Sequence, residues 1–137
     1  MMRTVVLVDT ADGKKNIAKV EAEREDAIKL IEVLKNVYSG STVVAMTSAE
    51  YKTLRGHISR VKMLVNRMNH YVKDGRKMIM TYVKGMLTEA GVVIAEIESG
   101  GTCGAKMDAE VARFKKNLSK IEKMVEEIEE GKGWYDV

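Results

Sequence analysis

Three stretches of the chain carry apolar residues that follow one another in alternating steps of three and four. The stretches run from Tyr51 to Val72, from Ile79 to Ile97 and from Met107 to Ile128. Residues at this spacing form one stripe along a helix, and the period of 3.5 suits packing against neighbouring helices. The pattern therefore predicts three long amphipathic helices.

A fourth stripe runs from Ile17 to Tyr38, with Arg24 as its one polar member. Residues typical of helix ends separate the stripes: Gly40-Ser41, Asp74-Gly75, Gly100-Gly101 and Gly131. We expect helices at about residues 14–39, 48–73, 76–98 and 107–130. Helices of this length and period predict an all-α fold, an antiparallel up-and-down four-helix bundle, in one domain that spans residues 1–137.

Two local features leave alternatives open. The apolar seam stays nearly in phase across Asp74-Gly75, so this dipeptide either turns the chain or lies within one long helix that would need a partner chain. The short apolar segments Thr4–Asp9 and Thr42–Met46 are either two parallel strands that flank the first helix or flaps that cover the bundle ends. By contrast, Thr47 to Glu50 forms a capping box, which places the start of the second helix.

Composition restricts the cellular setting. No segment resembles a signal peptide, and no run of about 18 apolar residues could cross a membrane, so we expect a cytoplasmic protein without a membrane partner. The single cysteine, Cys103, fits a reducing compartment. The absence of proline and glutamine and the 31% charged residues favour helices and lean towards a thermophilic source.

No local motif for catalysis, cofactor binding or metal binding emerges. The segment Gly100–Lys106 is glycine-rich and precedes a helix, but it lacks the spacing of a phosphate-binding loop. His57 and His70 are 13 residues apart on one helix, which separates them by about 140° and prevents a shared metal. Cys103 has no neighbouring base. We therefore expect a protein that is not an enzyme and has no catalytic, cofactor or metal residues.

Charge is distributed unevenly along the chain. Residues 51–84 carry nine Lys and Arg against one acid, Asp74, whereas the whole chain has a net charge of only +3. A basic helix face can follow a phosphate backbone, although a solvated surface would look the same. The candidate nucleic-acid contacts of this alternative function are Lys52, Arg55, Arg60, Lys62, Arg67 and Lys73.

Apolar residues beyond the seams give the leading functional hypothesis. The first and third expected helices each carry a second apolar line, wider than a monomer needs unless it faces two neighbouring helices. We expect this candidate dimer or partner surface to comprise Leu30, Val33, Val37, Met80, Leu87 and Ile94. The expected partners are a second copy of the chain and a further protein, and the aromatic Trp134-Tyr135 tail could add an anchor.

Taken over its full length, from Met-Met-Arg-Thr-Val-Val-Leu to Gly-Lys-Gly-Trp-Tyr-Asp-Val, the sequence resembles a small protein encoded by a lemon-shaped virus of hyperthermophilic archaea. The four stripes separately resemble the antiparallel bundles of adhesion and scaffolding proteins, such as focal-adhesion-targeting and vinculin-like domains. The resemblance implies a protein-protein interaction module in the cytoplasm of the host cell, and it assigns no individual binding residue.

Overall fold

The computed structural model describes residues 3–101 and 103–132, so the Trp134-Tyr135 tail lies outside the described part of the chain. Its internal contacts divide the chain into two compact units. The first, here called the sheet unit, comprises Met1–Gly56 and Gly100–Val111. The second, here called the helical unit, comprises His57–Ser99 and Ala112–Val137. The single domain expected from the sequence stays a prediction.

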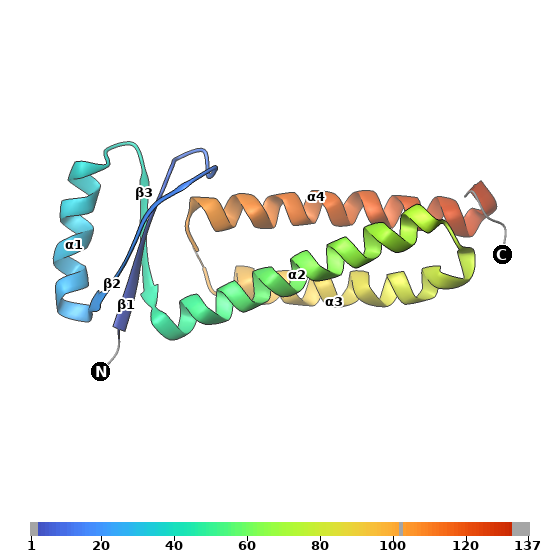
Figure 1. The fold of residues 1–137 in the computed structure, drawn as a ribbon, viewed down its shortest axis with the longest axis horizontal. Helices are drawn as coiled ribbons and strands as arrows, with labels where there is room; N and C mark the ends of the chain where they lie inside the picture. The colour runs from blue at the N-terminus through green and yellow to red at the C-terminus, as the bar shows by residue number, and fades with distance from the viewer. Residues whose placement is uncertain (1–2, 102, 133–137) are drawn as a thin grey trace. The chain divides into compact units, whose positions relative to one another are not determined.

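The expectation of an all-α four-helix bundle is wrong, because the sheet unit contains a three-stranded antiparallel sheet. Its strands are β1 (Arg3–Asp9), β2 (Asn16–Glu23) and β3 (Thr42–Thr47), in the order β2-β1-β3 (Figure 1). The helix expected from residue 14 begins only at Arg24, and α1 spans Arg24–Val37.

Residues 16–23 form a strand because their polar and apolar side chains alternate with a period of two. Ala18, Val20 and Ala22 are half-buried, and the charged residues between them are exposed. This alternation gives one face to the core and one to solvent, as in an antiparallel strand. Ile17 and Val20 fit the helical stripe only by coincidence of spacing, and Ile17 is exposed.

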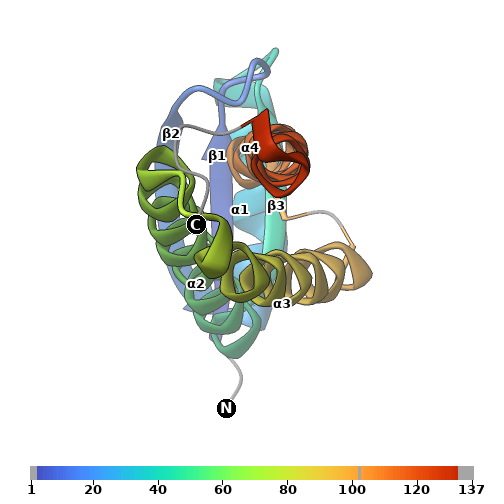
Figure 2. The same ribbon diagram turned by 90° about the vertical axis from the view of Figure 1, so that its right-hand side faces the viewer.

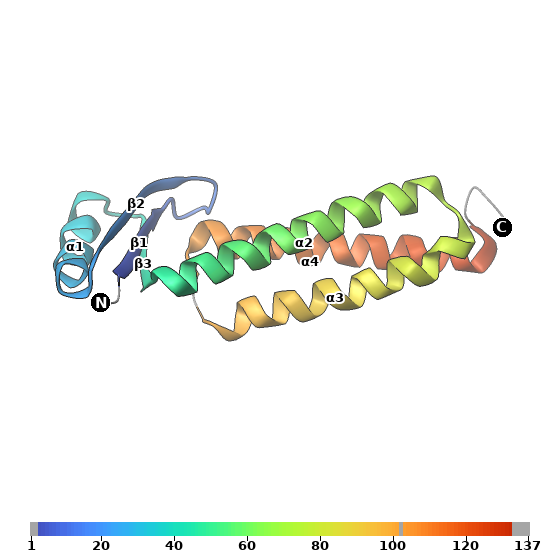
Figure 3. The same cartoon turned by 60° about the horizontal axis from the view of Figure 1, so that its bottom comes forward.

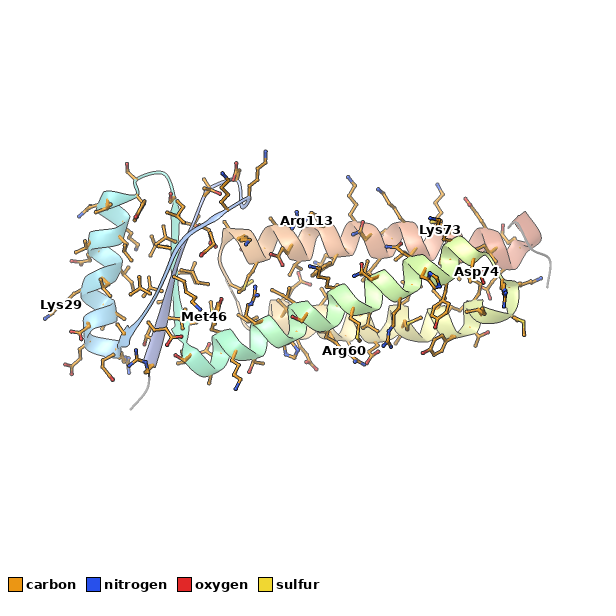
Figure 4. All side chains as sticks on the ribbon, in the orientation of Figure 1. Lys29, Met46, Arg60, Lys73, Asp74 and Arg113 are labelled. Atoms are coloured by element: carbon orange, nitrogen blue, oxygen red, sulfur yellow. The ribbon has the colours of Figure 1, made fainter. Side chains whose placement is uncertain are left out.

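The central strand β1 is buried, so its backbone N–H and C=O groups need hydrogen-bond partners, and a strand pairs with it on each edge. Val6 pairs with Val20 of β2 and with Ala45 of β3, while Val5 pairs with Met46 of β3. In Figure 4, Met46 lies on the side of the sheet opposite α1, so Val5 and Leu7 share that side. Helix α1 packs against β1 and β3 on the face of Val6, and Tyr51 of α2 and Met107 of α4 lie with Leu7 around one pocket on the other face.

Of the two alternatives left open for the apolar segments, the strands are correct, but their parallel arrangement is wrong. Both segments are strands, but β1 and β3 pair antiparallel. The reason is the turn at Thr10–Lys15, which connects β1 to β2 and reverses the chain before α1 begins. Helix α1 therefore connects β2 to β3, and these two strands run in the same direction on opposite edges of the sheet.

The helical unit is built from α2 (Ser48–Asp74), α3 (Met80–Ser99) and α4 (Ala105–Glu127), the first and last of which begin in the sheet unit. A short 3-10 helix η1 (Lys77–Ile79) precedes α3, and a π-helical turn η2 (Ile128–Lys132) follows α4. Within this unit, the three helices run lengthwise beside one another (Figures 2 and 3).

The three apolar seams that predicted these helices form the core. Seam residues that are buried in the helical unit are Ile58, Val61, Val65, Met68, Val72, Val83, Met86, Ala90, Ile97, Ile121, Val125 and Ile128. The capping box is confirmed, since the Glu50 amide donates to Thr47 Oγ1 at 3.1 Å and the Thr47 amide donates to Glu50 Oε1 at 3.4 Å. The chain turns after Asp74, where Gly75 has a φ of +73°, so the alternative of one long helix is excluded.

Candidate interaction surfaces

The outer flank of α1 exposes apolar side chains in the sheet unit. Ala27 is the one fully buried residue of α1, and Ile31 and Leu34 are half-buried against the sheet. Val33 and Val37 remain 54% and 65% exposed, and Leu30 beside them is half-buried. Their spacing of three and four residues puts these three side chains in one line along the helix. We call Leu30, Val33 and Val37 the α1 stripe.

The third-helix residues of the expected partner surface belong to the helical unit, whereas the α1 stripe belongs to the sheet unit. Met80 and Ile94 are core residues of the helical unit, and Leu87 is half-buried. The wide apolar stripe of α3 faces two neighbouring helices, α2 and α4, and both of its lines are covered within the unit. Met80 and Ile94 therefore do not form an open docking surface.

A groove between α2 and α3 opens on one side of the helical unit and has a volume of about 630 Å³. Leu64 and Met86 line it among other residues, and the exposed Met78 and Tyr82 lie at its border. The Tyr82 ring packs edge-on against Tyr71, with 5.6 Å between the ring centroids. Sequence periodicity did not reveal this groove.

The basic residues expected to form one nucleic-acid surface are separated by the structure. Lys52 and Arg55 belong to the sheet unit, and the other four belong to the helical unit. Arg60 is paired with Glu89 of α3 and lines the groove together with Arg67. Lys62 and Lys73 lie on the other flank of α2, because 100° per residue places them about 200° and 140° away from Arg60. The six residues therefore do not form a single row.

A polar pocket of about 250 Å³ lies in the sheet unit, at the end of β1. Asp9 is only 2% exposed, accepts a hydrogen bond from Asn16 Nδ2 at 2.8 Å and accepts one from the Lys106 amide at 3.2 Å. The carboxylate of Asp9 thus caps the first turn of α4, where free backbone amides favour an anion. Arg55 and Lys106 also line this pocket, and the ammonium group of Lys19 lies over the ring of Tyr51.

Sequence reasoning missed Asp9, which reads as the polar end of an apolar run. Two glycines hold the backbone close to this site. A Cβ atom on Gly104 would lie 2.7 Å from Asp9 Oδ2, and one on Gly13 would lie 2.6 Å from the carbonyl oxygen of Ala105. The glycine-rich segment before α4 therefore serves close packing around Asp9.

Cys103 is buried, and its thiol donates a hydrogen bond to Asp108 Oδ1 at 3.1 Å. Burial, reinforced by the Asp108 carboxylate, raises the pKa of Cys103 to about 12. A thiol with so high a pKa is a poor nucleophile at neutral pH. His57 faces Glu96 at 3.5 Å, and among residues 3–101 and 103–132 no cluster of three metal-ligating side chains occurs.

One helical segment of the described chain, Lys77–Ser99, is long and apolar enough to cross a membrane by length and mean hydropathy. Six residues of its α3 portion, however, are buried within the helical unit. A core helix of a soluble protein meets the same length and hydropathy criteria. The expected absence of a membrane partner stays a prediction.

No protein-family model, curated protein or solved structure matches the chain. The resemblance to a protein of an archaeal virus stays a prediction. The likeness to four-helix adhesion domains depended on a helical stripe from Ile17 to Tyr38, and its first half is strand β2.

Proposed function

We propose that the protein is a non-enzymatic interaction module that forms a homodimer through the α1 stripe. The observation that carries this proposal is the exposure of Val33 and Val37 on the outer flank of α1. A helix that packs on a sheet usually turns its polar face to solvent, and these two valines break that rule. An apolar line without a cover in the monomer favours a partner at this position.

A second copy of the chain is the occupant that fits the stripe. Two-fold dimers use the same patch on both subunits, so a line of apolar residues at steps of three and four packs against its own copy. The two-fold axis then passes near Val33, the middle residue of the stripe. A further protein partner remains part of the proposed role, as does a setting in the cytoplasm of the virus-infected archaeal host.

The strength of the dimer follows from the area available. Burying a valine completely is worth about 1.5–3 kcal/mol, and about half of each Val33 and Val37 side chain is still exposed. Two valines from each subunit then contribute roughly 4 kcal/mol, close to the lower end of the cost of association. We therefore expect a weak dimer whose population rises with concentration.

Light scattering coupled to gel filtration, at protein concentrations from about 10 to 500 µM, tests the proposal with two double variants. Val33→Lys combined with Val37→Lys should keep the mass at that of the monomer, 15.3 kDa, at every concentration. Lysine favours helices more than valine does, so the variant should fold. The control, Val92→Lys combined with Met124→Lys, changes two exposed apolar residues of the helical unit and should dimerise like the unmodified chain. Equal masses for both variants at all concentrations would contradict the proposal.

A further inference from the structure

The acids of α3 face basic residues of neighbouring helices, and five further acids of the helical unit lie on α4 and η2. Every acid of α3 has an ion-pair partner on another helix of this unit. The ion pairs that involve α3 are His57–Glu96, Arg60–Glu89, Lys115–Glu98 and Lys84–Glu129. Arg60 and Lys115 therefore neutralise Glu89 and Glu98.

Four other cations form a row on α4. Arg113, Lys116, Lys120 and Lys123 are all exposed, and no ion pair joins them to any residue of the described chain. At 100° per residue, they lie about 80–160° around the helix from Lys115, which is directed to α3 by its ion pair with Glu98. Residues 112–121 of α4 contain no acid. The row is thus positive and turned away from α3.

Helix α2 adds two cations that are also turned away from α3. Lys62 and Lys73 are exposed, and their separation of 11 residues puts them within about 20° of one line. Figure 4 shows Arg60 on the side of α2 that borders α3, whereas Lys73 lies toward α4. Residues 57–73 of α2 contain no acid. We call the six residues the basic face: Lys62, Lys73, Arg113, Lys116, Lys120 and Lys123.

We propose that the basic face binds the phosphate backbone of double-stranded nucleic acid without reading its sequence. A surface that is merely solvated usually mixes both signs of charge, whereas residues 57–73 of α2 and 112–121 of α4 contain no acid. The row from Arg113 to Lys123 is about 15 Å long and the pair on α2 spans about 16 Å, enough to follow several phosphates.

The residues between these cations favour nucleic acid over a lipid surface. Asn66, Asn69 and Ser119 are exposed polar side chains that can donate hydrogen bonds to phosphate oxygens. A helix that lies in a membrane interface instead places a continuous apolar face beside its cations. Four of the six residues, those of α4, were absent from the surface expected from the sequence, which followed α2 alone. The proposal concerns the helical unit and does not depend on dimerisation through α1.

The number of contacts predicts the salt dependence. Six phosphate contacts give a slope of about −5 for the logarithm of the binding constant against the logarithm of salt concentration. Binding should therefore weaken about a thousandfold between roughly 50 and 200 mM salt. Loss of two contacts should reduce the slope to about −3.6 and weaken binding on the order of 60-fold at roughly 0.1 M salt.

Fluorescence anisotropy of a labelled duplex of about 25 base pairs, titrated with the full chain, provides the test. The variant Lys116→Gln with Lys120→Gln should show the reduced slope and affinity. The matched control, Lys84→Gln with Lys115→Gln, removes the same charge from residues paired with Glu129 and Glu98, and should bind within about threefold of the unmodified chain. Circular dichroism should report equal helix content for all three proteins.

Three results would overturn the proposal. The first is no binding of the duplex at roughly 50 mM salt. The second is an equal loss of affinity in both double variants, which would mean that net charge matters and the basic face does not. The third is binding to vesicles with 30% phosphatidylserine at a salt concentration where the duplex does not bind, which would assign the surface to anionic lipid.

Discussion

Substitution of Gly13 by alanine tests how the hairpin tip of the sheet unit packs on the first turns of α4. Gly13 has a φ of +73°, in the left-handed region that disfavours side chains. A Cβ atom there would lie 2.6 Å from the carbonyl oxygen of Ala105 and 2.8 Å from the Cβ atom of Ala109. Both distances are shorter than van der Waals contact, and the first involves backbone that cannot move alone.

Gly40 supplies a matched control in the same unit. Its φ is +87°, and a Cβ atom there would meet no heavy atom within 4 Å. Gly40→Ala should therefore show only the conformational cost, about 1–2 kcal/mol of unfolding free energy. Gly13→Ala should show that cost plus overpacking of about 1–3 kcal/mol, hence about 2–5 kcal/mol in total.

Urea unfolding followed by circular dichroism at 222 nm measures both effects. The reasoning requires the unfolding free energy of Gly13→Ala to fall below that of Gly40→Ala by at least about 1 kcal/mol. Equal losses in the two variants would show that the hairpin tip does not rest on α4, and would remove the packing reason given for Gly13.

Four further predictions concern single residues. Because burial and Asp108 raise the pKa of Cys103, its thiol should react with a disulfide reagent at pH 8 about a thousandfold more slowly in the native chain than in urea, and a similar rate in both would contradict this. Because the raised pKa favours the protonated thiol in the folded state, the contribution of Cys103 to stability is complete below about pH 9 and is lost as pH rises towards about 12. Cys103→Ser should therefore make the unfolding free energy fall less steeply over that pH range. Thr47→Ala should lower the unfolding free energy by about 1 kcal/mol through loss of the helix cap, whereas Thr53→Ala on the exposed side of α2 should change it by less than about 0.5 kcal/mol. Asp9→Ala should cost about 2 kcal/mol, since the Asn16 amide and the Lys106 N–H lose their acceptor, and no loss would contradict the capping role.

The sequence predicted the three long helices well, because their seams continue over several turns and only one period fits them. It failed at residues 16–23, where apolar residues satisfy a helical spacing and a strand alternation at once. A contact that is distant in sequence, the pairing of β2 with β1, decides the conformation of these residues. The buried backbone of β1 needs a hydrogen-bonding strand on each edge, and no local pattern shows which segments supply them.

The sequence also could not show which apolar residues of the first and third helices stay exposed, because that depends on how many neighbours each helix has. Val33 and Val37 are exposed because α1 has one layer beneath it. Met80 and Ile94 looked equally surplus, but α3 has neighbours on two sides and buries both. The number of neighbours a helix has is a property of the fold, and periodicity within the helix cannot reveal it. The pocket at Asp9 likewise depends on residues that are 97 positions apart.

The claim that copies of the chain meet through α1 is tested most directly by a disulfide across the proposed two-fold axis. Val33→Cys places a thiol in the middle of the α1 stripe, and Val92→Cys places one at an equally exposed position of the helical unit. The native Cys103 is buried and should not compete. Under mild oxidation at about 100 µM protein, the proposal predicts that the Val33→Cys chain forms a covalent dimer much faster than the Val92→Cys chain, as measured on a non-reducing gel. Equal rates for the two variants would contradict a dimer through α1.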